Sequence, residues 1–339
     1  MVLKVLRWAG KAVLAGITAL VLLSAVALVY SCTGVHITNE TGATDYRWEP
    51  NQFRSNMAEG FSWFRMNGDG FNNSFDCSEV ERTDILLMGS SHMEACNVAK
   101  DRNAGFLLNR SLPQYVTCNI GISGHTIYQC VDNLQAAVSV YRPSEYILIE
   151  TDRIVLDEGR MQEVLAGKLE HIPSHDSGAL YLLQKYIPCF LPLYRNLENW
   201  KGASSVGSAD VAAGFSGEEI GKEDTYFDTL DRFLEKINCI AGNTKVIIFY
   251  HPETIIDANG LLPEPDTEAS DTFQQMCADH GITLLDMYGD FASLYQKEHK
   301  LAHGFANTAV GYGHLNEEGH RLIAERLTAE IKGEKNGVK

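Results

Sequence analysis

Short, continuous apolar runs recur through the part of the chain that follows residue 83. Each run is mostly apolar and does not alternate with polar residues, which is typical of strands that are covered on both faces of a sheet. The pattern predicts five strands: Ile85–Met88, Tyr115–Asn119, Tyr146–Glu150, Lys245–Tyr250 and Ile282–Asp286.

Apolar residues at helical spacing fill several of the intervals between these runs. Three such stretches predict helices: Thr126–Tyr141, Asp224–Ile240 and Glu317–Ile331. Repeated alternation of strand and helix predicts an α/β fold, with a parallel sheet and helices on both of its faces. Sheets of this kind bind ligands at the carboxyl ends of their strands, so the candidate chemistry is expected there.

The alternation is interrupted by about seventy residues, 153–223, between the third and fourth predicted strands. This segment has two or three short helical patterns and a tract of small residues from Gly202 to Gly217. A compact sheet does not need so long a connection, so we interpret it as an insertion over the strand ends, either a lid or a surface for a partner. For Gly202–Gly217 a disordered excursion is an equal alternative.

The first 32 residues differ from the rest of the chain. Lys4, Arg7 and Lys11 flank an uncharged apolar run over residues 12–30. As a helix this run would be about 28 Å long, which suits a membrane span and is long for a cleaved signal peptide. We therefore expect residues 1–32 to be a single-pass cell-membrane anchor, with a cytoplasmic N-terminus and an extracytoplasmic main domain. A buried core helix and lipidation at the following cysteine are minor alternatives.

Residues 33–80 are rich in Asn, Gly, Thr and aromatic side chains. We expect an irregular strap that packs its aromatic rings onto the main domain, and a carbohydrate platform is the less favoured alternative. We expect the α/β domain to occupy residues 81–333. A charged, frayed tail is expected over residues 334–339.

Composition limits the partners. The net charge of −16 argues against nucleic acid, because a phosphate backbone requires a basic surface. The eight cysteines form no CxxC pair, and Cys118, Cys130, Cys239 and Cys277 lie in apolar or helical runs. We expect most of them to be buried thiols, and we expect no metal and no cofactor.

The first predicted strand ends in Gly89-Ser90-Ser91-His92. A serine here would lie at the end of a buried strand and at a helix N-terminus, where backbone N–H groups and the helix dipole favour a nucleophile. The same pattern fits an ordinary strand-to-helix turn with a serine N-cap. Residues far along the chain decide between the two.

Two glycine-rich stretches lie further along the chain. Asn119-Ile120-Gly121-Ile122-Ser123-Gly124-His125 follows the second predicted strand, and Gly311-Tyr312-Gly313-His314-Leu315-Asn316 precedes the last predicted helix. With Gly89-Ser90-Ser91 they resemble the blocks of the SGNH (GDSL-like) hydrolase superfamily, over roughly residues 84–150 and 243–331. The segment from His314 to His320, with the helix behind it, is the most specific part. The resemblance implies a doubly wound, flavodoxin-like three-layer sandwich around a five-stranded parallel sheet.

The resemblance also implies a role for each matching residue. Ser91 would be the nucleophile, and His314 would act first as general base and then as general acid. The backbone N–H groups of Ser91 and Gly124 would face the oxyanion. Asp152, or Thr151 as the alternative, falls at the position of the family's asparagine, and a protonated carboxyl or a hydroxyl there would donate to the oxyanion.

One residue of the family pattern is missing. Three residues before the histidine the family has an aspartate, and this chain has Gly311. The sequence therefore names no carboxylate to orient His314, and a backbone carbonyl or another acid is required. Asp286, at the end of the fifth predicted strand, is a spare candidate.

Several other polar residues are expected near the strand ends. Pocket positions are assigned to His92, His125, His251 and Asn316. A polar helix start is the favoured alternative for His92, whereas pocket and non-pocket roles are balanced for His125 and His251. His320, on the last helix, is expected to pack or cap rather than to bind a metal.

These observations predict an extracytoplasmic serine esterase or O-acyltransferase that acts on acylated cell-envelope glycan or a small ester through an acyl-Ser91 intermediate. The changes at Gly311 and at Thr151–Asp152 make the chain similar to membrane-anchored SGNH-like proteins that work beside membrane-bound O-acyltransferases, so such an enzyme is an expected partner. The alternative is a degenerate domain that binds glycan or scaffolds a membrane complex.

Overall fold

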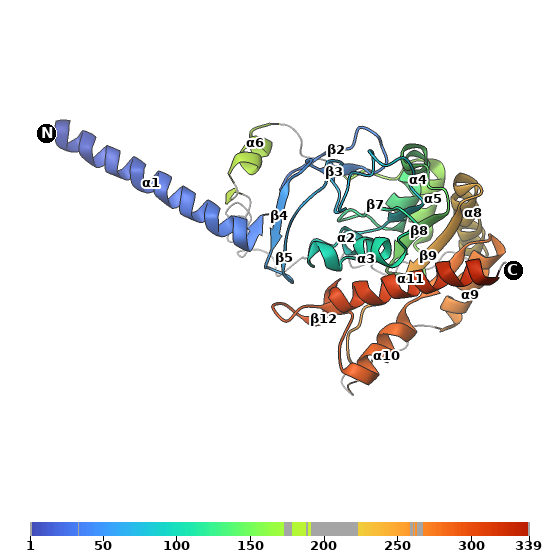
Figure 1. Ribbon diagram of the computed structural model, residues 1–339. Helices are drawn as coiled ribbons and strands as arrows, with labels where there is room; N and C mark the ends of the chain where they lie inside the picture. The colour runs from blue at the N-terminus through green and yellow to red at the C-terminus, as the bar shows by residue number, and fades with distance from the viewer. Residues whose placement is uncertain are drawn as a thin grey trace.

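The computed structural model describes residues 2–32, 34–172, 178–187, 189–190, 223–257, 260, 262 and 267–337. Its centre is a five-stranded parallel sheet in the order β10–β9–β8–β6–β7 (Figure 1). The bounds of its strands are β6 Ile85–Met88, β7 Thr117–Asn119, β8 Tyr146–Thr151, β9 Lys245–Tyr250 and β10 Thr283–Asp286. The first strand in sequence lies between the second and third, so the chain winds outward in both directions from β6. This confirms the predicted doubly wound α/β fold.

Different helices cover the two faces of the sheet. One core contains residues of α4 (Ile127–Tyr141), α5 (Glu158–Ala166), α8 (Glu223–Ala241) and α9 (Thr267–Asp279). The other contains residues of α3 (Ala104–Ser111), α10 (Tyr288–Glu298) and α11 (Glu317–Gly337). Along β6, Leu86 and Met88 enter the first core and Ile85 and Leu87 the second. Burial on both faces explains why the strand runs are continuously apolar.

The C-terminal helix is longer than predicted. Helix α11 continues through Gly333 to Gly337, so the expected frayed tail at residues 334–339 is wrong for most of its length. An interior glycine costs a helix only about 1 kcal/mol relative to alanine, and this is too little to end a helix that is already packed along its earlier turns.

The predicted irregular strap is partly regular, and here too the sequence interpretation needs correction. Strands β1 (Ser31–Cys32), β4 (Phe53–Asn56) and β5 (Ser62–Arg65) form an antiparallel sheet. Strands β2 (His36–Thr38) and β3 (Tyr46–Trp48) form a separate hairpin. Each strand has two to four residues, too few for a periodic pattern to reveal.

A third small sheet precedes the last helix. Strand β11 (His303–Gly304) pairs with β12 (Val310–Leu315), so His314 lies in a strand and not in the expected loop. The three glycines and the turn before β12 hid this hairpin from the sequence pattern. A short 3₁₀ helix, η1 (Lys100–Arg102), precedes α3 on the same side of the sheet.

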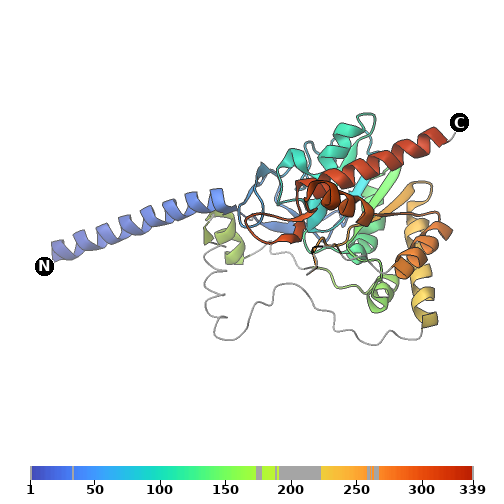
Figure 2. The same cartoon turned by 90° about the horizontal axis from the view of Figure 1, so that it is seen from below.

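Helix α1 (Val2–Tyr30) projects away from the α/β domain (Figures 1 and 2). Within the described residues it is the helix whose length and apolar composition would allow it to cross a membrane, over Leu3–Tyr30. A signal sequence has the same properties. Helix α6 (Gly178–Tyr186), from the predicted insertion, lies beside its C-terminal end, where the Ser24 hydroxyl donates to Cys189 Sγ at 3.4 Å (Figure 1). The Gly202–Gly217 tract lies outside the described residues.

Candidate active site

The two serines at the end of β6 have different positions. Ser90 is the N-cap of the four-residue helix α2 (Ser91–Glu94), and its hydroxyl accepts from the backbone N–H of His92 at 3.1 Å. Ser91 is the first residue of that helix, at the carboxyl edge of the sheet. The capping role therefore belongs to Ser90, and the Ser91 hydroxyl is left for other partners.

The Ser91 hydroxyl lies 3.0 Å from Nε2 of His314. On the other side of the ring, Nδ1 lies 2.7 Å from Oε2 of Glu59. A carboxylate at Nδ1 fixes the proton on that nitrogen, and this leaves the lone pair of Nε2 to accept from the serine hydroxyl. Ser91, His314 and Glu59 are thus arranged like the serine, base and orienting acid of a hydrolytic triad.

Glu59 comes from the turn between β4 and β5, in the strap, and not from the strand ends. Its Oε1 also accepts from the backbone N–H of His314 at 2.9 Å, so the carboxylate holds both the ring and the main chain. This approach requires Gly313, because a Cβ there would lie 2.6 Å from Oε1. Burial acts to raise the pKa of Glu59, but its bonds to His314 outweigh burial and hold the pKa below its usual value.

The acid expected three residues before the histidine has no room in this structure. Gly311 has φ of +86°, and a Cβ on it would lie 2.7 Å from the carbonyl oxygen of Thr254. The spare candidate, Asp286, is not the orienting acid either. Its Oδ1 accepts from the N–H of Tyr288 at 2.8 Å and its Oδ2 from the Ser270 hydroxyl at 3.2 Å, so both oxygens bond to groups other than His314.

His92 connects the segment that carries Ser91 to the segment that carries His314. Its Nδ1 accepts from the backbone N–H of Leu315 at 3.1 Å. Burial first, and then the neighbouring rings of His251 and His314, hold the pKa of His92 well below its usual value, so the ring is neutral at ordinary pH. A neutral ring whose acceptor nitrogen is occupied serves as a brace between two catalytic segments, and not as a second base.

The expected oxyanion loop packs directly behind the nucleophile. The N–H of Ile122 donates to the carbonyl of Gly89 at 3.0 Å, and the Tyr46 hydroxyl donates to the carbonyl of Ser123. Among the described residues, the N–H groups of Ser91 and Gly124 donate to no acceptor. The position of both amides near the strand ends is compatible with an oxyanion hole, and that role stays a prediction.

The third predicted donor position is less open. The hydroxyl of Thr151, which is buried, donates to the carbonyl of Arg153 at 2.9 Å, so its proton is used within its own loop. Asp152, the next residue, is exposed. A contribution of Thr151 or Asp152 to the oxyanion hole also stays a prediction.

A second network of serine, carboxylate and histidine lies directly beneath the first. Both carboxylate oxygens of Glu150, the penultimate residue of β8, contact Ser90: the N–H donates to Oε2 at 2.6 Å and the hydroxyl to Oε1 at 2.8 Å. His251 Nε2 lies 2.6 Å from Oε1 of the same carboxylate. The side chains of Glu150 and His251 are about 2% and 1% exposed, so this network is closed to solvent.

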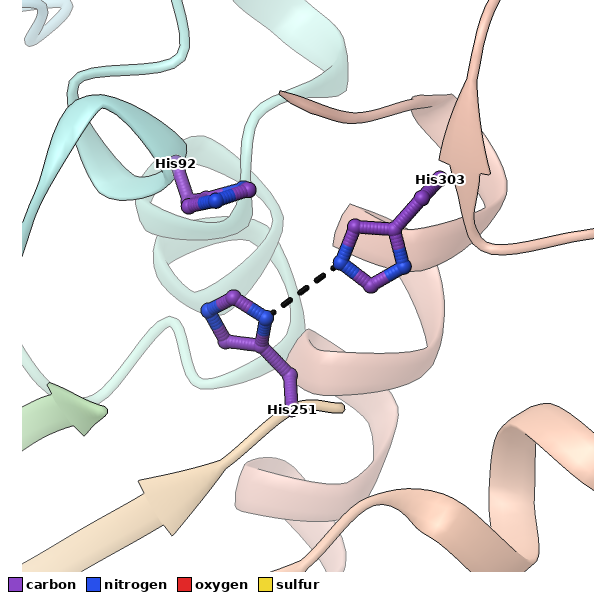
Figure 3. A group of neighbouring side chains, drawn as sticks. All are labelled: His92, His251 and His303. Carbon is purple, nitrogen blue, oxygen red and sulfur yellow. Dashed lines mark hydrogen bonds between the residues drawn. The ribbon is translucent and has the colours of Figure 1, made fainter. Parts of the chain in front are cut away.

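The buried network continues from His251 to a second histidine, His303 (Figure 3). His251 Nδ1 lies 3.3 Å from Nε2 of His303, and His303 Nδ1 lies 3.3 Å from the Thr254 hydroxyl. One set of neutral tautomers satisfies every contact: threonine donates to His303, His303 to His251, and His251 to the glutamate. Burial, with the nearby rings of His251 and His320, lowers the pKa of His303 to about 2, which agrees with a neutral ring.

One ring nitrogen from each of His92, His251 and His303 lies within 4.8 Å of the other two, a spacing that a metal ion could bridge (Figure 3). A metal requires a lone pair from each ring. The lone pair of His92 Nδ1 faces the N–H of Leu315, which leaves the proton of the neutral ring on Nε2. His251 Nδ1 faces the N–H of His303. The donor set therefore fits a hydrogen-bonded chain better than a metal.

Other residues assigned to the pocket lie at its margin. Asn316 caps α11, since its Oδ1 accepts from the N–H of Glu318 at 2.9 Å, and it lines a groove of about 580 Å³. The groove runs beside Gly60 and Phe305, next to the acid and away from the nucleophile. His125 is buried, with Nε2 3.9 Å from Asp45 Oδ2. His320 is buried too, and burial lowers its pKa to about 3.

No protein-family model matches the chain, and no curated protein matches it. Among solved structures, an acetyl xylan esterase aligns with 16% identity over 73% of this chain and 99% of its own, with a TM-score of 0.41. A lipolytic protein of the G-D-S-L family from Veillonella parvula aligns with 19% identity over 73% and 96%, with a TM-score of 0.38. An acetylxylan esterase mutant from Geobacillus stearothermophilus aligns with 15% identity over 74% and 94%, with a TM-score of 0.39.

Proposed function

We propose that the protein is a serine esterase of the SGNH type that works through an acyl-enzyme on Ser91. The observation that carries the proposal is the continuous set of contacts from the Ser91 hydroxyl through His314 to Glu59, at 3.0 and 2.7 Å. The base is accessible to a substrate, since the side chain of His314 is 32% exposed. A histidine with a purely structural role could be fully buried, whereas a general base must be reached by the substrate.

The chemistry follows from the positions of the atoms. Nε2 of His314 takes the Ser91 proton as the oxygen attacks the ester carbonyl, and the oxyanion forms near the N–H groups of Ser91 and Gly124. The imidazolium, stabilised by Glu59, then returns the proton to the leaving alcohol. In the second half of the reaction a water or a sugar hydroxyl gives its proton to the same nitrogen as it attacks the acyl carbon, and Ser91 is released.

The finer proposal concerns the substrate and the location. We propose that helix α1 is a membrane anchor, that the domain is extracytoplasmic, and that the ester is an acyl group on a cell-envelope glycan. The apolar Leu3–Tyr30 helix supports the anchor. An O-acyltransferase activity, with a membrane-bound O-acyltransferase as a partner, belongs to the same proposal. The alternative, a degenerate binding domain, rests on Gly311 and on the altered loop at Thr151–Asp152. The contact of Glu59 with His314 at 2.7 Å weakens the first ground and leaves the second.

Labelling of the full chain in detergent with a fluorophosphonate probe tests the esterase. The probe is expected to label the protein and not its Ser91→Ala variant, with Ser90→Ala as the matched control that retains labelling. A folded protein that the probe does not label would refute the esterase and favour the binding domain. Acetylated xylan or peptidoglycan fragments, with and without an added unacetylated acceptor, then separate hydrolysis from transfer.

A further inference from the structure

Exposed apolar side chains gather where α1 joins the domain, and the catalytic function does not account for them. Phe61 and Trp63 are 60% and 62% exposed, on the outer face of the β4–β5 sheet. Leu182 and Tyr186 are 52% and 71% exposed on α6. Single exposed apolar residues are common, but a group of this kind on neighbouring elements indicates an interaction surface.

The strand register places the first two residues at the level where α1 ends. The carbonyl of Tyr30, the last residue of α1, accepts from the N–H of Met57 at 2.8 Å. In the β4–β5 hairpin Asn56 pairs with Ser62, so Phe61 lies next to Met57. If α1 crosses a bilayer, these residues therefore lie at its surface, where aromatic side chains are most stable.

Helix α6 reaches the same level from the other side of the chain. Cys189, just after it, contacts Ser24 in the last turns of α1. The polar side chains of α6 face the strap: Gln184 donates to the carbonyl of Gly34 at 2.5 Å, and Lys185 pairs with Glu49. Leu182, Leu183 and Tyr186 are exposed on the other side of the helix. A short helix with polar contacts on one side and exposed leucines on the other is typical of a helix that lies in the membrane interface.

We propose that Phe61, Trp63, Leu182, Leu183 and Tyr186 form a membrane-contact surface that seats the catalytic domain on the outer leaflet of the lipid bilayer. The proposal rests on the proposed membrane anchor. Continuity with α1 favours lipid as the occupant, because the surface begins where the apolar helix ends. Glu59 lies in the turn between Met57 and Phe61, so the catalytic acid is two residues from this surface. The triad is thereby placed to act on a substrate presented at the membrane surface.

Spin labels on the full chain in nanodiscs of phosphatidylethanolamine and phosphatidylglycerol test the proposal. Labels are introduced by Phe61→Cys and Leu183→Cys in a background where Cys32 and Cys239 are replaced by serine; the other described cysteines are buried. The control is Phe227→Cys on α8, 40% exposed and on the side of the domain away from α1 (Figure 1). The ratio of collisions with oxygen to collisions with a water-soluble nickel chelate should be several-fold higher at 61 and 183 than at 227.

Equal ratios at the three positions would overturn the proposal and leave α1 as the sole anchor. Protection from both reagents at 61 and 183 would also overturn it, because a protein partner or a second copy would then cover the surface. Fluorophosphonate labelling of Ser91 is measured in the same nanodiscs. If the spin labels are exposed to lipid but the fluorophosphonate does not react with Ser91, the esterase is contradicted and the membrane-contact surface is supported. In a supporting variant, Leu183→Asp should make the label at 61 more accessible to nickel, and Phe227→Asp should not.

Discussion

Two adjacent serines each contact a glutamate–histidine pair, yet the two sets are built for different tasks. Around Ser91 the order is serine, histidine, glutamate, and the His314 and Glu59 side chains are 32% and 24% exposed. Around Ser90 the order is serine, glutamate, histidine, and the carboxylate and imidazole are almost fully buried. The residue types are the same, but histidine and glutamate exchange places: the serine contacts the histidine in the first set and the glutamate in the second.

The order decides which chemistry is available. A histidine between serine and acid has its lone pair directed at the hydroxyl and can take the proton. A glutamate between serine and histidine accepts from both, so the Ser90 hydroxyl is one of three donors to the same carboxylate, with the Ser90 N–H and His251 Nε2. We therefore propose that the first set is catalytic and that the second holds the turn on which the first is built.

Removal of each serine hydroxyl gives the largest contrast. Ser91→Ala should lower kcat for a small ester by roughly 10⁴-fold or more, because the nucleophile is lost. Ser90→Ala should lower it by no more than about tenfold and should cost about 1–2 kcal/mol of stability, through the lost cap and the lost bond to Glu150. Steady-state kinetics and thermal unfolding of both variants measure the contrast. Equal kinetic losses would mean that the two sets are not functionally distinct.

The acid of the catalytic set comes next. Glu59→Gln should lower kcat by roughly 10²–10⁴-fold with little change in KM, because a neutral amide no longer stabilises the imidazolium. Since its bonds to His314 hold the pKa of Glu59 below its usual value, the wild-type carboxylate is ionised at neutral pH. Asp286→Asn is the matched control and should leave kcat unchanged. Near-normal activity of Glu59→Gln would show that another group orients His314.

The acid of the buried set should matter for stability instead. Glu150→Gln removes a charged acceptor of three hydrogen bonds and should cost roughly 2–4 kcal/mol of unfolding free energy. Glu59→Gln, at a partly exposed site, should cost less than about 1 kcal/mol. Chemical unfolding of the two variants in detergent compares them directly. A larger loss of stability for the Glu59 variant would reverse the assignment of the two sets.

The smallest expected effect is a pH dependence of stability from the buried histidines. His303 and His320 have folded-state pKa values of about 2 and 3, below that of an unfolded histidine. The unfolded chain therefore binds more protons between about pH 3 and pH 6.5, and stability falls as the pH is lowered through that range. Each residue should account for up to about 2 kcal/mol between pH 6.5 and pH 5. His320→Leu should flatten this slope, and an unchanged slope would exclude His320 as a contributor.

Much of the fold was predictable from the chain, because buried parallel strands leave continuous apolar runs. The bounds of β6 and β9 agree with the prediction. Ser91 and His314, proposed from glycine-rich stretches far apart in the chain, lie 3.0 Å apart in the structure. Glu59 was not predicted. It lies 255 residues from His314, in a turn between strands too short to show a pattern. Gly311 was the available signal, since a missing acid indicates that another segment must supply one.

The pair His251 and Glu150 was also missed as a unit. Each residue ends or follows a predicted strand, and the carboxyl ends of neighbouring parallel strands meet at one edge of the sheet. The sequence predicts a pocket position for His251, but Glu150 only as the last residue of a strand. Sequence spacing shows which side chains share that edge, but the tautomers and bond directions that separate a base from a brace depend on three-dimensional packing.

The contact between Glu59 and His314 has a consequence for the order of folding. It closes a loop of 255 residues, and contacts of such long sequence separation form late because their closure entropy must be offset by structure already present. The sheet, its helices and the Ser90 network can therefore assemble before the triad is complete. A refolding chain should regain its secondary structure and its buried core first, and its catalytic activity last.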